Sequence, residues 1–198
     1  MEINRDIYLN RLITRKQNGF IKVITGIRRC GKSYLLNKIF YNYLLSEGVD
    51  KNHIIRFAFD SADDLLLIDE DILDISEQNR KVDPRKFMKY LAGKIVDDEM
   101  YYLLLDEVQL LGNFEAVLNG YMRKDNLDIY VTGSNSKFLS SDILTEFEGR
   151  GDEIHVLPLS FSEFYSVYEG TKEEAFDDFM VYGGLPAIAS MQTDEQKD

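Results

Sequence analysis

The sequence predicts an α/β fold, a three-layer sandwich in which a mainly parallel sheet of five strands lies between helices. Strand-like and helix-like segments alternate along the chain, as they do in folds built from parallel strands and helical crossovers. The first predicted strand ends in a glycine-framed loop, and the third ends in an Asp-Glu pair. Because such crossovers are right-handed, these segments are expected to form one sheet covered on both faces.

Five short segments rich in β-branched and apolar residues are predicted to be the strands. They cover residues 20–25, 53–59, 101–105, 128–132 and 153–157. The segment at 101–105 is a continuous apolar run bounded by charge, which is typical of a strand buried on both faces.

Helices are predicted between these strands from apolar residues at helical spacing. They cover residues 32–45, 84–96, 113–123 and 137–147, and Pro84 suits the first turn of the second. The Asp- and Leu-rich stretch at 61–76 is expected to contain an amphipathic helix, since Ile68, Ile72 and Ile75 share one face. Beyond Pro158 the pattern is helical again, so we divide the chain into a core at 1–158 and a helical extension at 159–198.

The composition is that of a globular protein, with 44% hydrophobic and 29% charged residues among 198. The single cysteine excludes an internal disulfide, and neither a secretory signal nor a membrane span is expected, so the sequence favours a cytoplasmic protein without a membrane partner. The net charge of −12 includes −9 from residues 151–198, which argues against a broad nucleic-acid interface. A small basic patch remains an alternative to ordinary solvated surface; its members would be Arg11, Arg15, Lys16, Lys22, Arg28 and Arg29.

The loop after the first strand has the pattern G-x-x-x-x-G-K-[ST], which is typical of a phosphate-binding loop. Glycines let successive backbone N–H groups turn inward, and the helix start adds partial positive charge. Lys32 is predicted to bind the β- and γ-phosphates, and the Ser33 hydroxyl to ligate Mg²⁺. The side chains of Arg28 and Arg29 are expected to point outward, without a catalytic role. The predicted cofactor-binding residues are Gly26, Ile27, Arg28, Arg29, Cys30, Gly31, Lys32, Ser33 and Tyr34.

Two Asp-Glu pairs follow apolar runs, and only one is expected to hold the metal. Asp69-Glu70 lies in the predicted amphipathic helix, whereas Asp106-Glu107 ends the predicted buried strand. We therefore predict that Asp106 positions Mg²⁺ together with Ser33, and that Glu107 polarises the attacking water. The alternative for Glu107 is an ordinary surface acid at a strand end.

Polar residues after the fourth strand, Thr132, Ser134 and Asn135, are expected at the same sheet edge as Asp106. Ser134 or Asn135 is predicted to contact the γ-phosphate or the attacking water; capping of the next helix is the alternative. Arg150, between two glycines, either reaches a neighbouring subunit's nucleotide or pairs with Asp152 or Glu153. Cys30 is a candidate for a thiol that oxidants or alkylating reagents reach.

The ordered series of motifs resembles the predicted bacterial and archaeal AAA+ ATPases that carry a second, C-terminal domain of uncharacterised function. Besides the phosphate loop and Leu-Leu-Leu-Asp-Glu, it includes Gly149-Arg150, Leu-Pro-Leu-Ser-Phe-Ser-Glu-Phe and Gly183-Gly184-Leu185-Pro186. The resemblance runs from about Tyr8 to Pro186 and implies the strand order 5-1-4-3-2. It further implies that Gly26 to Ser33 form Walker A, Asp106 and Glu107 form Walker B, Ser134 or Asn135 is sensor 1, and Arg150 resembles the arginine finger of a homo-oligomer.

The resemblance implies ATP and Mg²⁺ as cofactors and ATP hydrolysis as the activity. One departure concerns sensor 2, since no arginine follows Arg150. The chain is also expected to be a fragment that lacks much of the lid and the C-terminal domain, which hydrolysis would drive or gate. The alternatives are a nucleotide-dependent switch that recruits a protein or DNA partner and, with less support, a small-molecule kinase.

Overall fold

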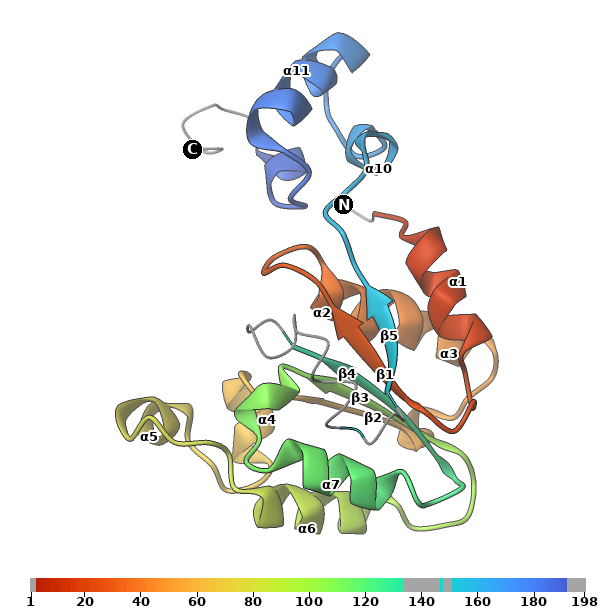
Figure 1. The fold of residues 1–198 in the computed structure, drawn as a ribbon, viewed down its shortest axis with the longest axis vertical. Coiled ribbons are helices and arrows are strands. Elements are labelled where there is room, and N and C mark those ends of the chain that lie inside the picture. Colours follow the sequence, from red (N-terminus) through yellow and green to blue (C-terminus); the bar gives the residue numbers. More distant parts are fainter. Residues whose placement is uncertain (1–2, 134–146, 148–150, 192–198) are drawn as a thin grey trace.

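The computed structural model describes residues 3–133, 147 and 151–191, and its centre is a five-stranded parallel sheet. The strands are β1 (Ile21–Thr25), β2 (Ile54–Ala58), β3 (Tyr101–Asp106), β4 (Leu127–Thr132) and β5 (Gly151–His155). Their order is β2-β3-β4-β1-β5, which is the predicted 5-1-4-3-2 order read from the opposite edge. The predicted fold class and strand order are therefore confirmed (Figure 1).

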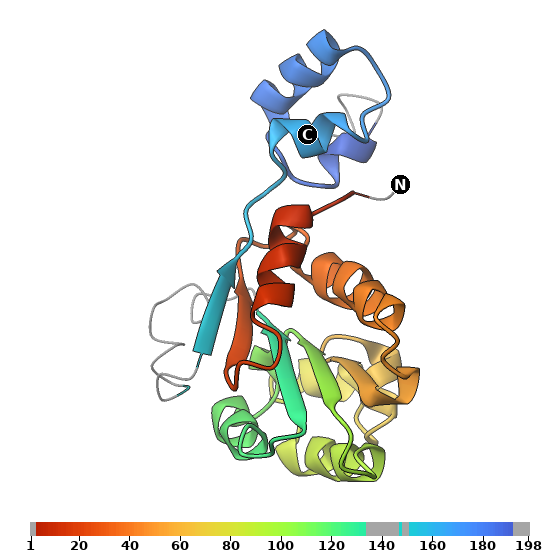
Figure 2. The same ribbon diagram turned by 90° about the vertical axis from the view of Figure 1, so that its right-hand side faces the viewer.

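Helices cover both faces of the sheet, as Figures 1 and 2 show. On one face lie α1 (Asp6–Thr14) and a continuous helical run, α2 (Lys32–Tyr34), the π-helical η1 (Leu35–Phe40) and α3 (Tyr41–Ser46). The sequence analysis did not predict α1, which buries Tyr8 and Leu12 against this face. The core on this side also contains Phe40, Leu104 and Tyr130.

The opposite face is covered by α6 (Pro84–Lys94) and α7 (Phe114–Tyr121), with the short turns η2 (Lys51–His53) and η3 (Val108–Leu110) beside the strands. Aromatic rings fill much of this second core, where the Phe57 and Phe87 centroids are 5.1 Å apart and those of Phe59 and Phe87 4.9 Å apart. A sheet with a core on each face can carry functional side chains only at its edges and strand ends.

The acidic, leucine-rich stretch forms two short helices, α4 (Ala62–Leu66) and α5 (Ile72–Glu77). The single helix expected through Ile68 is interrupted by Asp69, whose φ of 55° is left-handed. Ser61 and Asp71 each accept a hydrogen bond at the start of one of the two helices. Because serine and aspartate favour the N-cap position, Ser61 and Asp71 stabilise two separate helix starts, and the stretch forms two short helices in place of one.

The helical extension contains α10 (Phe161–Tyr165), α11 (Lys172–Tyr182) and the turn η4 (Ile188–Ser190). Both helices begin with a capping box, Ser160 with Glu163 and Thr171 with Glu174. The extension has its own apolar cluster, which includes Phe164, Ala175 and, from the other end of the chain, Ile3. It follows directly from the carboxyl end of β5 (Figure 2). Of the helix predicted at 137–147, only Phe147 lies within the described residues, and it is buried.

Candidate nucleotide site

The phosphate-loop sequence connects β1 to α2, the strand-to-helix context that the motif requires. Two glycines set its shape. Gly26 has a φ of 142°, and a Cβ there would lie only 2.2 Å from the carbonyl oxygen of Val156. Gly31, at a φ of 100°, is the residue before the helix. A side chain at either position would strain the backbone, and the close approach of Gly26 to Val156, the residue just after β5, depends on glycine.

Lys32 is almost completely buried, with 4% of its surface exposed. Its Nζ donates hydrogen bonds to the carbonyl oxygens of Gly26 (3.0 Å) and Ile27 (2.9 Å), so the ammonium group lies across the mouth of its own loop. A buried ammonium needs such acceptors. If phosphates occupied the loop, their oxygens could replace the carbonyl oxygens of Gly26 and Ile27 as acceptors for the Lys32 ammonium.

Asp106, the last residue of β3, is the centre of a hydrogen-bonded cluster at the carboxyl end of the sheet. The Ser33 hydroxyl donates to its Oδ1 over 3.0 Å, and the Asn37 amide donates to its Oδ2 over 3.1 Å. The Thr132 hydroxyl, from the end of β4, also donates to Oδ1. Three elements thus hold one carboxylate in a fixed orientation, with 5% of the residue exposed.

Burial raises the pKa of the Asp106 carboxyl above its ordinary value, because the charged form is poorly solvated there. The hydrogen bonds from Thr132 and Ser33 act in the opposite direction, and the nearby carboxylate of Glu107 adds to the rise. An incompletely compensated anion of this kind favours a nearby cation.

Glu107 follows in a left-handed conformation, with φ 52° and ψ 45°. Such a conformation is uncommon for a residue with a side chain, and it directs Glu107 out of the strand's alternation. Its backbone N–H donates to the Thr132 hydroxyl over 3.0 Å, and its carboxylate accepts a hydrogen bond from the side-chain amide of Gln109. The Glu107 carboxylate is therefore bonded to Gln109, whereas the carboxylate of the adjacent Asp106 is bonded to Ser33, Asn37 and Thr132.

The rival pair, Asp69-Glu70, lies outside this cluster. Glu70 is buried and paired with Arg80 at 2.5 Å and with Lys86 at 3.3 Å. Its contacts are those of a structural carboxylate between α4 and α6.

The extension touches the phosphate loop. Pro186, in the Gly-Gly-Leu-Pro turn, lies 3.7 Å from the point where a Cβ of Gly31 would be. Arg5, only 3% exposed, donates to the carbonyl oxygens of Leu157 (2.6 Å) and Cys30 (3.4 Å). Its Nε is also 3.3 Å from Glu163 of α10, an ion pair without hydrogen-bond alignment. One buried guanidinium thus joins the N-terminal segment, the loop and the extension.

The structure excludes the accessible thiol suggested at Cys30 and removes two members from the alternative basic patch. Cys30 is completely buried and packs in the core on the α1 side, so it is not an accessible thiol. Lys22 is also completely buried, where it pairs with Asp128, and Arg15 pairs with Asp152 at 2.8 Å, so neither side chain is free to build the suggested basic patch. Arg28 and Arg29 are exposed, as expected from their positions in the loop.

Ser134, Asn135 and Arg150 lie outside the described residues. Sequence reasoning had named Thr132 at this sheet edge without choosing it, and it had overlooked Asn37 and Arg5. Asn37 follows Ser33 by four residues, a helical spacing that places both side chains on one face and was available from the sequence. For Arg5 no sequence signal existed, because its partners come from three distant parts of the chain.

The loop, the strand order and the position of Asp106 place the chain in the class of P-loop nucleotide-binding domains. Within that class it belongs to the AAA domain family, whose sequence model matches residues 18–165. The chain is a nucleotide-binding AAA+ domain.

Its curated relatives are longer proteins. An uncharacterized protein of Haemophilus influenzae is 32% identical over 192 residues, a match covering 94% of this chain and 44% of the relative. The uncharacterized protein MJ1544 of Methanocaldococcus jannaschii is 30% identical over 211 residues, covering 98% of this chain and 41% of the relative. The chain thus spans less than half the length of these two relatives.

Solved structures share the fold at low sequence identity. The chain resembles PCH-2 of C. elegans with a TM-score of 0.55 and 16% identity, over 96% of this chain and 48% of that one. It resembles the ORC1 protein of Aeropyrum pernix, solved in complex with DNA, with a TM-score of 0.54 and 14% identity, over 100% of this chain and 64% of that one. No helix among the described residues is long and apolar enough to cross a membrane.

Proposed function

We propose that this domain binds ATP with Mg²⁺ and hydrolyses it. The observation that carries the proposal is the 3.0 Å distance between the Ser33 hydroxyl, at the end of the phosphate loop, and the carboxylate of Asp106. In P-loop hydrolases a hydroxyl and a strand-end carboxylate share one hydrated magnesium ion. The two oxygens lie close enough to do so.

The donor chemistry of this pair suits magnesium. Mg²⁺ prefers hard oxygen ligands, keeps several waters and uses one or two carboxylates together with substrate phosphates. Among the described residues no group of three or more His, Cys, Asp or Glu side chains forms a metal cage, which suits an ion held partly by nucleotide. When bound, Mg²⁺ would neutralise charge on the phosphates. In this proposal Lys32 and the loop from Gly26 to Tyr34 bind and orient those phosphates.

Glu107 is the proposed group that orients and polarises the attacking water. Its left-handed backbone and its Gln109 contact hold the carboxylate beside, but not on, the proposed metal ligand Asp106. Positioning of this kind supplies much of the catalysis of phosphoryl transfer to water. Ser134 or Asn135 remains the proposed sensor of the γ-phosphate.

Hydrolysis would act on more than this chain. We propose that the nucleotide cycle drives or gates a further region of a longer protein, in the cytoplasm, and that residues 159–198 begin a lid. The contacts of Pro186 and Arg5 support a coupling between loop and extension. Arg150 is the proposed contact to a neighbouring subunit, so Arg150→Ala is expected to slow turnover only where subunits associate.

A nucleotide-dependent switch with little turnover is the second candidate. The contact between Pro186 and Gly31 favours it, because an occupied loop would press directly on the extension. Such a switch would capture a protein or DNA partner in its ATP form with negligible phosphate release. An ATPase would release phosphate through repeated cycles.

The decisive experiment compares Glu107→Gln with Glu99→Gln, an exposed acid shortly before β3. We expect Glu107→Gln to abolish phosphate release while a fluorescent ATP analogue still binds, and Glu99→Gln to change neither. Normal hydrolysis by Glu107→Gln would remove Glu107 from its proposed role. Tight ATP binding by both variants and the unaltered protein, with no phosphate release by any of them, would favour the switch.

A further inference from the structure

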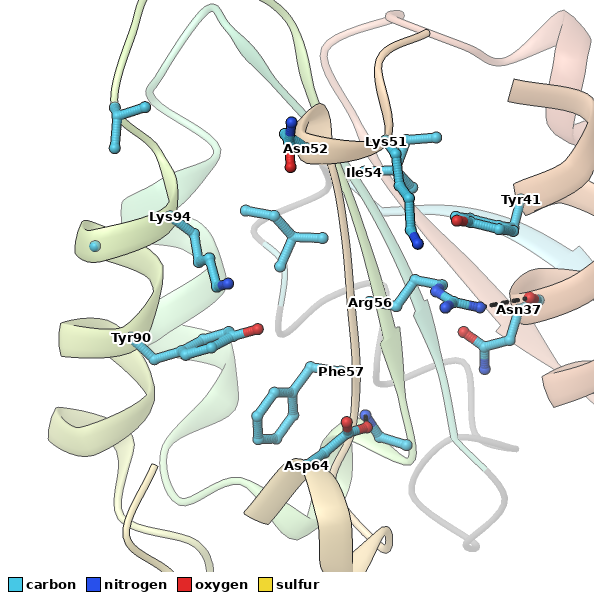
Figure 3. A pocket seen from close by; sticks show the side chains of 14 residues that line it. Asn37, Tyr41, Lys51, Asn52, Ile54, Arg56, Phe57, Asp64, Tyr90 and Lys94 are labelled. Carbon is cyan, nitrogen blue, oxygen red and sulfur yellow. Dashed lines mark hydrogen bonds between the residues drawn. The ribbon is translucent and has the colours of Figure 1, made fainter. Parts of the chain in front are cut away.

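A groove of about 820 Å³ runs along β2, the strand at one edge of the sheet. Figure 3 shows β2 at its floor, α6 on one side and the helical run of η1 and α3 on the other. The groove shares Asn37 with the nucleotide site but not the phosphate loop. It is therefore a separate feature of the domain.

Backbone groups of β2 face this groove. The Ala58 N–H donates to Oδ2 of Asp64 over 2.8 Å, so it points away from β3. The direction of the N–H and C=O groups alternates from one residue to the next along a strand. The N–H and C=O groups of Arg56, two residues before Ala58, therefore also point away from β3. The Asp64 carboxylate closes one end of the edge by satisfying Ala58 (Figure 3). The part of β2 before Ala58 thus presents main-chain hydrogen-bonding groups at the floor of the groove.

Basic and aromatic side chains line the walls. Lys51, Arg56 and Lys94 come from three different elements; Figure 3 shows Lys51 and Arg56 on the side of Tyr41 and Asn37, and Lys94 on the opposite side with Tyr90. The Arg56 guanidinium lies 4.0 Å from the Tyr41 ring centroid and donates to the Asn37 carbonyl oxygen over 3.3 Å. The Lys94 ammonium is 5.5 Å from the Tyr90 ring centroid.

These three cations are not neutralised locally. Among the residues that the structure describes, none of these three side chains forms an ion pair. One acid, Asp64, also lines the groove, but its carboxylate accepts a hydrogen bond from the Ala58 N–H, and the lining as a whole carries a net positive charge. It supplies charge complementarity for an anionic segment.

We propose that the groove binds an extended acidic peptide, which adds as a further strand to the edge of β2. Main-chain hydrogen bonds to an exposed sheet edge recognise an extended peptide, and flanking side chains give it specificity. The edge backbone at the groove floor favours a peptide over a nucleic acid, whose phosphates would use the cations but not the strand. The tyrosines supply apolar walls for the side chains between the acids.

The test uses a fluorescein-labelled peptide of alternating Glu and Val, about seven residues long, enough to cover a strand of this length. Fluorescence anisotropy with the unaltered chain is expected to show saturable binding that weakens with added salt. A matching Lys-Val peptide is expected not to bind. The Glu-Val peptide with alternate backbone amides N-methylated, so that one edge loses its donors, is expected to bind at least roughly tenfold more weakly.

Charge reversal tests the walls. The double variant Lys51→Glu/Lys94→Glu is expected to weaken binding by roughly tenfold or more, because attraction becomes repulsion. The matched control is Lys89→Glu/Lys124→Glu, which makes the same change in net charge at two exposed lysines outside the groove, one of them on α6. Circular dichroism before each titration checks that both variants are folded.

Three results would overturn the proposal. The first is equal binding of the plain and N-methylated peptides, which would show that the strand edge is not used. The second is equal loss in the groove and control variants. The third is binding of a single-stranded oligothymidylate of matched charge that exceeds peptide binding and is abolished by the groove variant, which would make the groove a nucleic-acid site.

Discussion

The amide of Asn37 donates a hydrogen bond to Oδ2 of Asp106 over 3.1 Å, while Ser33 and Thr132 both bind the other carboxylate oxygen. Asn37 is thus the one described contact that fixes the far side of the proposed magnesium ligand. It lies in the π-helical stretch η1, an irregular form of helix that is frequent at functional sites. The π-turn carries Asn37 toward β3 while Leu35, Leu36 and Phe40 stay buried.

Asn37→Ala is expected to raise the Mg²⁺ concentration that ATP hydrolysis requires, with a smaller effect on the stability of the fold. Loss of a residue that orients a metal ligand typically costs roughly ten- to a hundredfold in metal affinity or activity. Titrating hydrolysis with Mg²⁺ measures this effect. Asn18→Ala, which removes an exposed amide distant from Asp106, is the control and should leave the titration unchanged. An unaltered magnesium titration in Asn37→Ala would show that Asp106 needs no support from this side.

Glu70 provides a pH test that separates the two Asp-Glu pairs. Burial alone would raise the pKa of Glu70, but its hydrogen bonds with Arg80 and Lys86 outweigh burial and lower the pKa below the ordinary 4.5. The unfolded chain then binds more protons than the folded one between these two pKa values. The stabilisation by Glu70 is therefore complete above about pH 4.5 and is lost as the pH falls toward the lowered value.

We expect Glu70→Gln to reduce the free energy of unfolding at neutral pH by about 1.5–3 kcal/mol, the range for hydrogen bonds to a charged group. The difference from the unaltered protein should shrink as the pH falls below about 4.5. Urea unfolding across pH measures both. Hydrolysis per folded molecule should stay normal, in contrast to Glu107→Gln; a loss specific to hydrolysis would reopen the choice between the pairs.

The fold followed from the sequence because its signals are local and repeated. The apolar run at residues 101–105 indicates a buried strand, and the glycine-framed loop marks the end of another. The structure confirms the predicted strand order. The missed helix, α1, has only two buried residues, Tyr8 and Leu12, so its apolar periodicity is weak. Its docking depends on the finished sheet.

The candidate site was predictable to a smaller extent. The sequence places Ser33 just after the first strand and Asp106 at the end of the third, so both lie at the carboxyl edge of one parallel sheet, and these two side chains meet. Cys30 was misjudged because loop residues are usually exposed, whereas here the loop folds over its own thiol. The burial of Lys22 also escaped prediction, since its partner Asp128 lies on the neighbouring strand and only the register brings them together.

The Lys22–Asp128 pair is expected to contribute to stability rather than to nucleotide binding, because both residues lie near the amino ends of their strands. Burial lowers the pKa of Lys22, and Asp128 counteracts that shift. Asp128 also accepts hydrogen bonds from the Tyr130 hydroxyl and the Gln17 backbone N–H, each at 2.9 Å.

Asp128→Ala should therefore reduce the free energy of unfolding by about 3–5 kcal/mol, the cost of leaving a buried charge without its partner. Urea unfolding measures the change. Asp125→Ala, at an exposed position three residues earlier, is the control and should cost less than about 0.5 kcal/mol. Equal, small effects of both substitutions would show that water or another group compensates Lys22.

Arg5 is expected to hold the extension against the phosphate loop. Arg5→Met keeps much of the side-chain volume but removes the hydrogen bonds to Leu157 and Cys30 and the ion pair with Glu163. Because the carbonyl oxygen of Leu157 loses a charged donor, the link after β5 should open more often, and limited proteolysis there should become faster at unchanged protease concentration. Arg11→Met is the matched control, since Arg11 also lies over the Tyr8 ring, at 5.5 Å, but within the described part of the chain its side chain makes no hydrogen bond or ion pair with the loop or the extension. If bound ATP orders this link, added nucleotide should slow cleavage of the unaltered protein more than of Arg5→Met. Equal cleavage of Arg5→Met and Arg11→Met would show that Ile3 and the other apolar contacts of the extension hold it in place without the guanidinium.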